Sequence, residues 1–95
     1  MIYLCLGKIQ EMPYKVRVYG VEDALELHRA WREEECLYKD EWVHASCGDI
    51  TDEADTLLGK IHLNGRLEMY PMSDKNQEFY RETMAYFQRF SRGGR

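Results

Sequence analysis

The 95-residue chain contains little proline, the residue that most strongly breaks helices and strands. It has two prolines, Pro13 and Pro71, and no stretch rich in proline, glycine and serine, so we find no linker between domains. Its opening apolar run, residues 1–6, is far shorter than the roughly 20 residues of a membrane helix. That run also lacks a basic start and a small-residue cleavage site, which argues against a secretory signal.

Cysteine is also scarce. The three cysteines are Cys5, Cys36 and Cys47, and an odd number without an export signal favours reduced thiols and a cytoplasmic location. A chain that is 44% hydrophobic and 32% charged is typical of a folded globule rather than a disordered segment. We therefore expect one domain over residues 1–91 and a frayed basic tail over residues 92–95.

Hydrophobic periodicity predicts two main helices. Residues 20–34 place Val21, Ala24 and His28 on one face, and we interpret His28 as a hydrogen-bonded core histidine. A second helix begins after Ser73 or Asp74, and we expect its crowded aromatic face to be buried on a sheet. The cap signals from Thr51 to Gly59 predict a short third helix of about two turns.

Alternating or apolar runs predict the strands. The Asn64-Gly65 pair is the strongest of these signals, because a type I′ hairpin turn needs two residues that tolerate positive φ. The fold class that follows is α+β, with a mostly antiparallel sheet of about five strands and two main helices on one face. Its element order is β-β-α-β-α(short)-β-β-α, with strands expected at residues 2–9, 14–19, 40–47, 60–63 and 66–70.

Charge is distributed unevenly along the chain. The net charge is −4, yet residues 21–55 alone carry twelve acidic and three basic side chains, a net of −9. The flanks are basic, with +2 over residues 1–20 and +3 over residues 56–95. An acidic field of this kind repels nucleic acid and attracts basic surfaces.

The acidic middle of the chain is the predicted partner-binding site. Carboxylates spaced along a surface can imitate the phosphates of a duplex and occupy a basic groove. A tryptophan among them suits an interface anchor. The residues of this acidic belt are Glu33, Glu34, Glu35, Asp40, Glu41, Trp42, Asp49, Asp52, Glu53 and Asp55.

Metal binding is a second candidate, built on Cys36, His44, Cys47 and His62. Structural zinc sites usually show paired ligands such as Cys-x2-Cys, and here only His44 and Cys47 are so spaced. If that segment is a strand, the two side chains point to opposite faces. We predict no metal or other cofactor. No histidine near a serine or cysteine has an orienting carboxylate and an oxyanion turn, so we expect no enzyme.

Nucleic-acid binding through the last helix is a third candidate. Arginines lie close in sequence to aromatic residues there, a combination that binds single strands when both share one face. Helical spacing places them on opposite faces. The residues concerned are Arg81, Arg89, Arg92 and Arg95 with Tyr80, Tyr86, Phe87 and Phe90.

In size and charge the chain is similar to phage-encoded inhibitors of host defence, including anti-CRISPR proteins. No motif carries this likeness. It implies a small non-enzymatic inhibitor, a DNA mimic that blocks a basic, nucleic-acid-handling surface of a partner protein. A homodimer formed through an open sheet edge is compatible with each of these functions.

Overall fold

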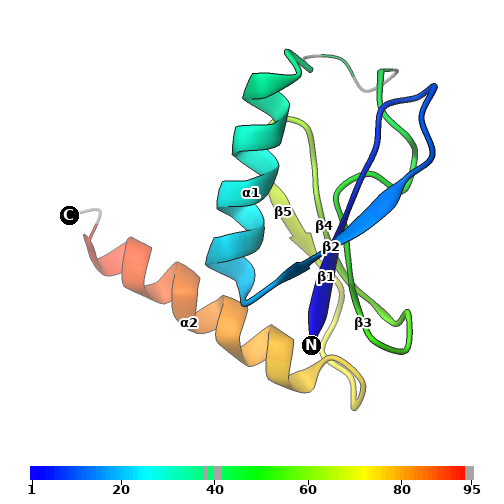
Figure 1. Ribbon diagram of the computed structural model, residues 1–95. Helices are drawn as coiled ribbons and strands as arrows, with labels where there is room; N and C mark the ends of the chain where they lie inside the picture. Colours follow the sequence, from blue (N-terminus) through cyan, green and yellow to red (C-terminus); the bar gives the residue numbers. More distant parts are fainter. Residues whose placement is uncertain (38, 40–41, 94–95) are drawn as a thin grey trace.

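A computed structural model of the chain describes residues 1–37, 39 and 42–93, with only the backbone of residues 90–93 (Figure 1). Its five strands form one antiparallel sheet in the order β2-β1-β3-β4-β5. The fold class predicted from the sequence, α+β with an antiparallel sheet and two helices, is confirmed. The elements are β1 (Ile2–Leu6), β2 (Tyr14–Val18), α1 (Val21–Glu34), β3 (Asp49–Asp52), β4 (Leu57–Ile61), β5 (Leu67–Met69) and α2 (Gln77–Gly93).

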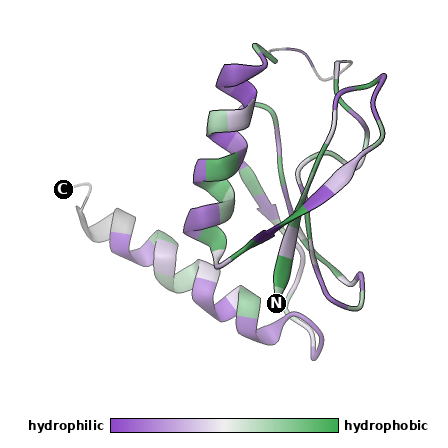
Figure 2. Ribbon diagram, viewed as in Figure 1, coloured by the Kyte–Doolittle hydropathy of each residue, from purple (hydrophilic) through white to green (hydrophobic). Residues whose placement is uncertain are grey.

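The core lies between the sheet and both helices. Leu4 of β1 is opposite Ile50 of β3, and both are fully buried beneath Val21 and Ala24 of α1. Phe79 of α2 packs over Gly59 of β4: a β-carbon at Gly59 would lie 3.6 Å from its ring, at van der Waals distance. The two helices therefore cover the same face of the sheet. In Figure 2 both helices mix hydrophobic and hydrophilic residues, as expected when one side packs and the other faces solvent.

Helix α1 agrees closely with its prediction. Glu22 and Asp23 lie in its first turn, and the Asp23 carboxylate accepts a hydrogen bond of 2.9 Å from the Tyr19 amide. At the other end Cys36 adopts a left-handed conformation with φ 54°, and the Leu37 amide donates to the Arg32 carbonyl at 3.0 Å. This backbone pattern ends the helix as a glycine would, and it buries Leu37 against the domain.

The strand expected over residues 40–47 is wrong. Residues 40 and 41 lie outside the described part of the chain, and from Trp42 to Gly48 the backbone forms turns, with one isolated bridge between Val43 and Lys8. Gly48, at φ 91°, sits between two strands: its amide donates to the Cys5 carbonyl and its carbonyl accepts from the Ile61 amide. The strand itself begins one residue later, because Ile50 finds Leu4 and Gly59 as partners.

The short helix expected from Thr51 is also wrong. Asp52 accepts hydrogen bonds at its Oδ1 from the amides of Ala54 and Thr56, at 2.9 and 2.8 Å. Asp55 takes a positive φ of 64°, and the chain turns back into β4. The acidic residues that suggested a helix start instead form a turn, because Asp side chains bond the backbone of turns as readily as that of helices.

The hairpin around Asn64 and Gly65 is confirmed in place, but its predicted turn type is wrong. Only Gly65 of the pair has a positive φ, 89°. The Gly65 amide donates to the His62 carbonyl at 2.8 Å, and the His62 amide donates to the Arg66 carbonyl at 2.9 Å. This is a three-residue loop in which glycine takes the left-handed position. Asn64 contributes through its side chain, whose Oδ1 accepts from the Arg66 amide.

Helix α2 begins later than predicted and is less buried. Asn76 occupies the N-cap position: it is buried, its carbonyl accepts from the Tyr80 amide at 2.8 Å, and its side chain bonds Ser73. Phe79 and Thr83 are buried, whereas Phe87 is 40% exposed. The outer half of the helix extends beyond the sheet (Figure 1), so the aromatic face is only partly covered. Neither described helix is long and apolar enough to cross a membrane.

The sheet has two edge strands, β2 and β5. Strand β5 has three residues, and β2 carries exposed Lys15 and Arg17. Short edges and edge cations discourage pairing with another chain. A homodimer through a sheet edge stays a prediction.

Candidate functional site

The acidic belt does not form one surface. Asp40 and Glu41 lie outside the described residues, and the other carboxylates separate into three places. Glu33, Glu34 and Glu35 lie at the end of α1, and Asp52, Glu53 and Asp55 lie at the β3–β4 turn, the opposite end of the molecule (Figure 1). Asp49 lies within the sheet.

Several belt carboxylates are paired with cations of the same chain. Glu35 lies 3.3 Å from the Lys8 ammonium and Glu33 lies 3.4 Å from Arg29. Hydrogen bonding to Glu35 is the main reason that the pKa of Lys8 is raised, and bonding to Asp55 raises that of Lys15 in the same way. Exposed pairs of this kind contribute little to stability, but they reduce the net charge a partner meets.

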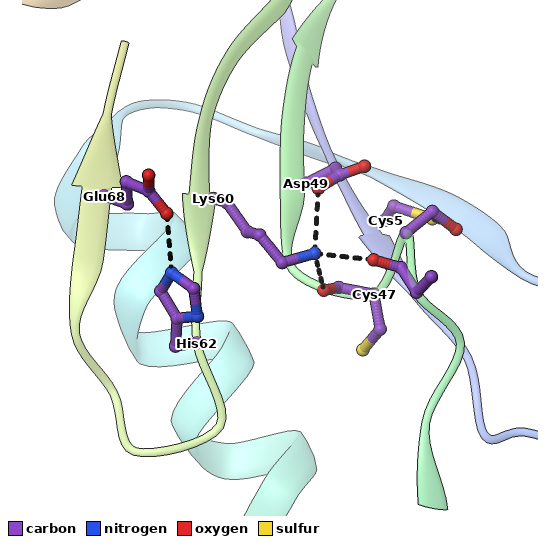
Figure 3. A network of polar contacts seen from close by, with 8 residues as sticks. Cys5, Cys47, Asp49, Lys60, His62 and Glu68 are labelled. Atoms are coloured by element: carbon purple, nitrogen blue, oxygen red, sulfur yellow. Dashed lines mark hydrogen bonds and ion pairs between the residues drawn. The ribbon is translucent and has the colours of Figure 1, made fainter. Parts of the chain in front are cut away.

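Asp49 and Lys60 form a partly buried pair beside the 42–48 segment (Figure 3). The Lys60 ammonium lies 3.2 Å from Asp49 and also donates to the carbonyls of Ala45 and Cys47, at 2.6 and 3.2 Å. Lys60 therefore anchors this irregular segment to β4. The arrangement gives Asp49 a structural role in the fold.

Trp42 is 39% exposed and lies beside the β1–β2 loop. Its carbonyl accepts from the Ile9 amide at 2.8 Å, and the Lys39 ammonium lies 5.4 Å from its ring centre. This places it near the α1 end of the molecule, where Lys8 bonds Glu35, and far from the β3–β4 turn.

The structure assembles a different acidic surface around the start of α1. Two adjoining hollows share Tyr19 and Glu82, and seven carboxylates line them against three side-chain cations, counted among the described residues. We call this set the α1-start acidic surface. Its carboxylates come from three parts of the chain: Glu22, Asp23, Glu26, Asp52, Glu53, Glu78 and Glu82.

Only Asp52 and Glu53 of this surface belonged to the predicted belt. The Asp52 carboxylate is hydrogen-bonded within the β3–β4 turn. The hydrogen bond that it accepts from the Thr56 amide is the main reason that its pKa is lowered. Glu53 lies 3.4 Å from the N-terminal ammonium. The α2 carboxylates could not be assigned to this surface from sequence, because only the packing of α2 across the start of α1 brings them there.

The predicted metal ligands come together only in part. His44, Cys47 and His62 line one hollow of about 200 Å³, whereas Cys36 is exposed at the end of α1. His44 is held by the Glu11 carbonyl and His62 by Glu68 at 2.8 Å (Figure 3). Burial raises the pKa of the Cys47 thiol. Among the described residues no three such side chains are arranged to hold a metal ion.

His28 also lines this hollow, and the sequence did not indicate it. Its side chain is fully buried, as predicted, but neither ring nitrogen has a hydrogen-bond partner, so the expected hydrogen bond is wrong. Burial is the main reason that the pKa of His28 is lowered to about 4, and the charges of Arg32 and Lys60 lower it further. The ring is therefore neutral near pH 7.

The basic helix also differs from its prediction. The Arg89 guanidinium lies 5.7 Å from the Tyr86 ring centre, so arginine and aromatic are neighbours rather than on opposite faces. Arg89 also lies 3.8 Å from Glu22, which places it inside the α1-start acidic surface. The side chains of Arg92 and Phe90, and all of Arg95, lie outside the described part.

Each candidate site is thus assembled from segments distant in sequence. A comparison of the chain with protein-family models, with curated proteins and with solved structures gives no match.

Proposed function

We propose that the protein is a non-catalytic binding protein that covers a basic, nucleic-acid-handling surface of a partner protein. The observation that carries this proposal is the α1-start acidic surface, where seven carboxylates from three parts of the chain lie against three side-chain cations among the described residues. Carboxylates at several points of a curved surface complement a groove built to hold phosphates.

An aromatic side chain lies at the centre of this surface. Tyr19 is 83% exposed and lines both hollows, with the Arg17 guanidinium 5.3 Å from its ring centre. Tyrosine is enriched among residues that dominate binding energy, because it supplies area and a polar hydroxyl at low entropic cost. In the proposal Tyr19 is the anchor and the carboxylates set orientation and association rate.

The remaining belt residues lie outside the proposed contact. Glu33, Glu34, Glu35 and Trp42 lie toward the other end of the molecule, so one flat partner surface cannot contact both groups. We propose the α1-start acidic surface as the primary contact. The chain's size and acidity fit the phage-type, anti-CRISPR-like inhibitor named above, and its free cysteines suit a cytoplasmic location.

The test is a displacement experiment with matched charge variants. Lysate proteins held on DNA–cellulose are challenged with the purified protein at low salt, and released proteins are identified and then tested as purified components. One variant combines Glu26→Lys, Glu78→Lys and Glu82→Lys. The control combines Glu33→Lys, Glu34→Lys and Glu35→Lys, which changes the charge equally at the other end.

We expect the wild type and the control to release the same DNA-binding protein, and the first variant to release it at least tenfold less efficiently. High salt should abolish release. Circular dichroism establishes that both variants are folded. Equal loss in the two variants, loss in the control alone, or no release by the wild type contradicts the proposal.

A further inference from the structure

Another hollow, of about 610 Å³, lies between the last turns of α1 and the β4–β5 loop, at the end of α1 away from the acidic surface. Helix α1 contributes Arg29, Arg32 and Glu33, and the loop contributes His62, Asn64 and Arg66. Leu37 and Leu63 add apolar wall. This volume is in the range of sites that hold small organic molecules.

The charge of this hollow is opposite to that of the whole chain. Three guanidinium groups and one carboxylate line it, a formal charge of +2 with His62 neutral, in a protein whose net charge is −4. Arg29 is within 3.5 Å of both Glu33 carboxylate oxygens, which leaves part of its guanidinium fork free. A ligand with two negative charges would balance the formal charge of +2 on the side chains that line the hollow.

Arg32 is the most constrained of the three arginines. Its Nη1 donates to the Leu63 carbonyl, and its guanidinium packs against the loop at Gly65. Its Nε is buried without a hydrogen-bond partner, and burial lowers the pKa of the group. A cation held partly out of water is stabilised electrostatically when an anion approaches it.

We propose that this hollow binds the phosphate group of a small organic phosphate monoester. A phosphate monoester carries close to two negative charges near pH 7, which matches the hollow. Guanidinium forks bind phosphate oxygens in pairs, and here they approach from a helix and from a loop. Leu37 and Leu63 provide apolar wall for the organic part of the ligand. An organic part is expected because the hollow is larger than a phosphate group alone would fill. The site is independent of the α1-start acidic surface.

The test is an NMR titration of the full chain with phenyl phosphate, with inorganic phosphate as competitor and benzoate as the carboxylate comparison. We expect saturable shifts of the Asn64 and Gly65 amides and reversal by inorganic phosphate. Arg66→Gln should weaken binding about tenfold, the effect of losing one hydrogen-bonded charge. Arg81→Gln, the same change at an exposed position on α2, should leave affinity unchanged.

Arg29→Gln provides a second variant in the same hollow, with the same expected weakening. The proposal is overturned if the loop amides do not shift, or if Arg66→Gln and Arg81→Gln weaken binding equally. Benzoate binding as tightly as phenyl phosphate would assign the hollow to carboxylates instead. None of these results depends on the DNA–cellulose experiment.

Discussion

The hollows at the two ends of helix α1 are lined by side chains of opposite net charge. At its start, carboxylates from α1, the β3–β4 turn and α2 surround two hollows. At its end, three arginines from α1 and the β4–β5 loop surround another, even though Glu33, Glu34 and Glu35 are there too. The local sequence is most acidic where the folded hollow is most basic. Surface charge is therefore set by which distant segments pack together, not by the charge of a single segment.

The helix dipole favours this arrangement. The start of a helix carries a partial positive charge and its end a partial negative charge, so carboxylates at the start and cations at the end are both stabilised. Glu22 and Asp23 lie in the first turn of α1 and Arg32 lies in its last. The dipole therefore favours the carboxylates of the first turn and Arg32, whereas it disfavours Glu33 and Glu34, which also lie in the last turn.

The largest effect should come from His28, which lies beneath the arginine end. In the unfolded chain its pKa is near 6.5, whereas in the folded protein burial holds it at about 4. Between these values the unfolded state binds more protons, so stability falls as pH decreases from 6.5 to 4. A pKa shift of this size corresponds to a loss of about 3 kcal/mol in the free energy of unfolding over this pH range. Urea unfolding at several pH values measures the slope of the free energy of unfolding against pH.

His28→Leu is the control for that slope. Leucine is similar in volume and leaves no unpaired nitrogen, so the variant should fold and lose most of the stability change between pH 6.5 and 4. An unchanged slope in His28→Leu would show that His28 is not the source of the pH dependence.

The arginine end depends on the backbone of its loop. Gly65 has φ 89°, and a β-carbon there would lie 3.4 Å from an Arg32 guanidinium nitrogen. Gly65→Ala should cost about 1 kcal/mol through the left-handed conformation and should displace Arg32. Chemical denaturation measures the first effect, and the phenyl phosphate titration measures the second. Gly20→Ala is the matched control, since Gly20 is extended and open space surrounds it.

Sequence periodicity predicted the elements whose stability is local. The apolar periodicity and the first-turn acidic residues of helix α1 can be seen in the sequence, and so can the glycine that the β4–β5 hairpin loop needs. The prediction for residues 42–48 is wrong because their conformation depends on tertiary contacts: Gly48 bonds two strands at once, and Lys60 holds the segment. The prediction for residues 51–58 is wrong because an Asp side chain stabilises a local turn as readily as a helix start. The acidic residues Asp52 and Glu53 were recognised, but their neighbours on α2 and the opposing arginines required the fold.

The smallest effect should come from the acidic end itself. Glu78 and Glu82 are four residues apart on α2, and like charges at this spacing repel by about 0.2–0.5 kcal/mol. Glu82→Gln should therefore raise the free energy of unfolding slightly, and the gain should shrink as salt screens the repulsion. Glu33→Gln, at the arginine end, should show no such gain, because it also removes the ion pair with Arg29, 3.4 Å away. Thermal unfolding at low and high salt distinguishes the two variants. A larger gain from Glu33→Gln would mean that carboxylate repulsion is stronger at the end of α1 than at its start. The contrast between the two ends would then follow the local sequence and not the packing of distant segments.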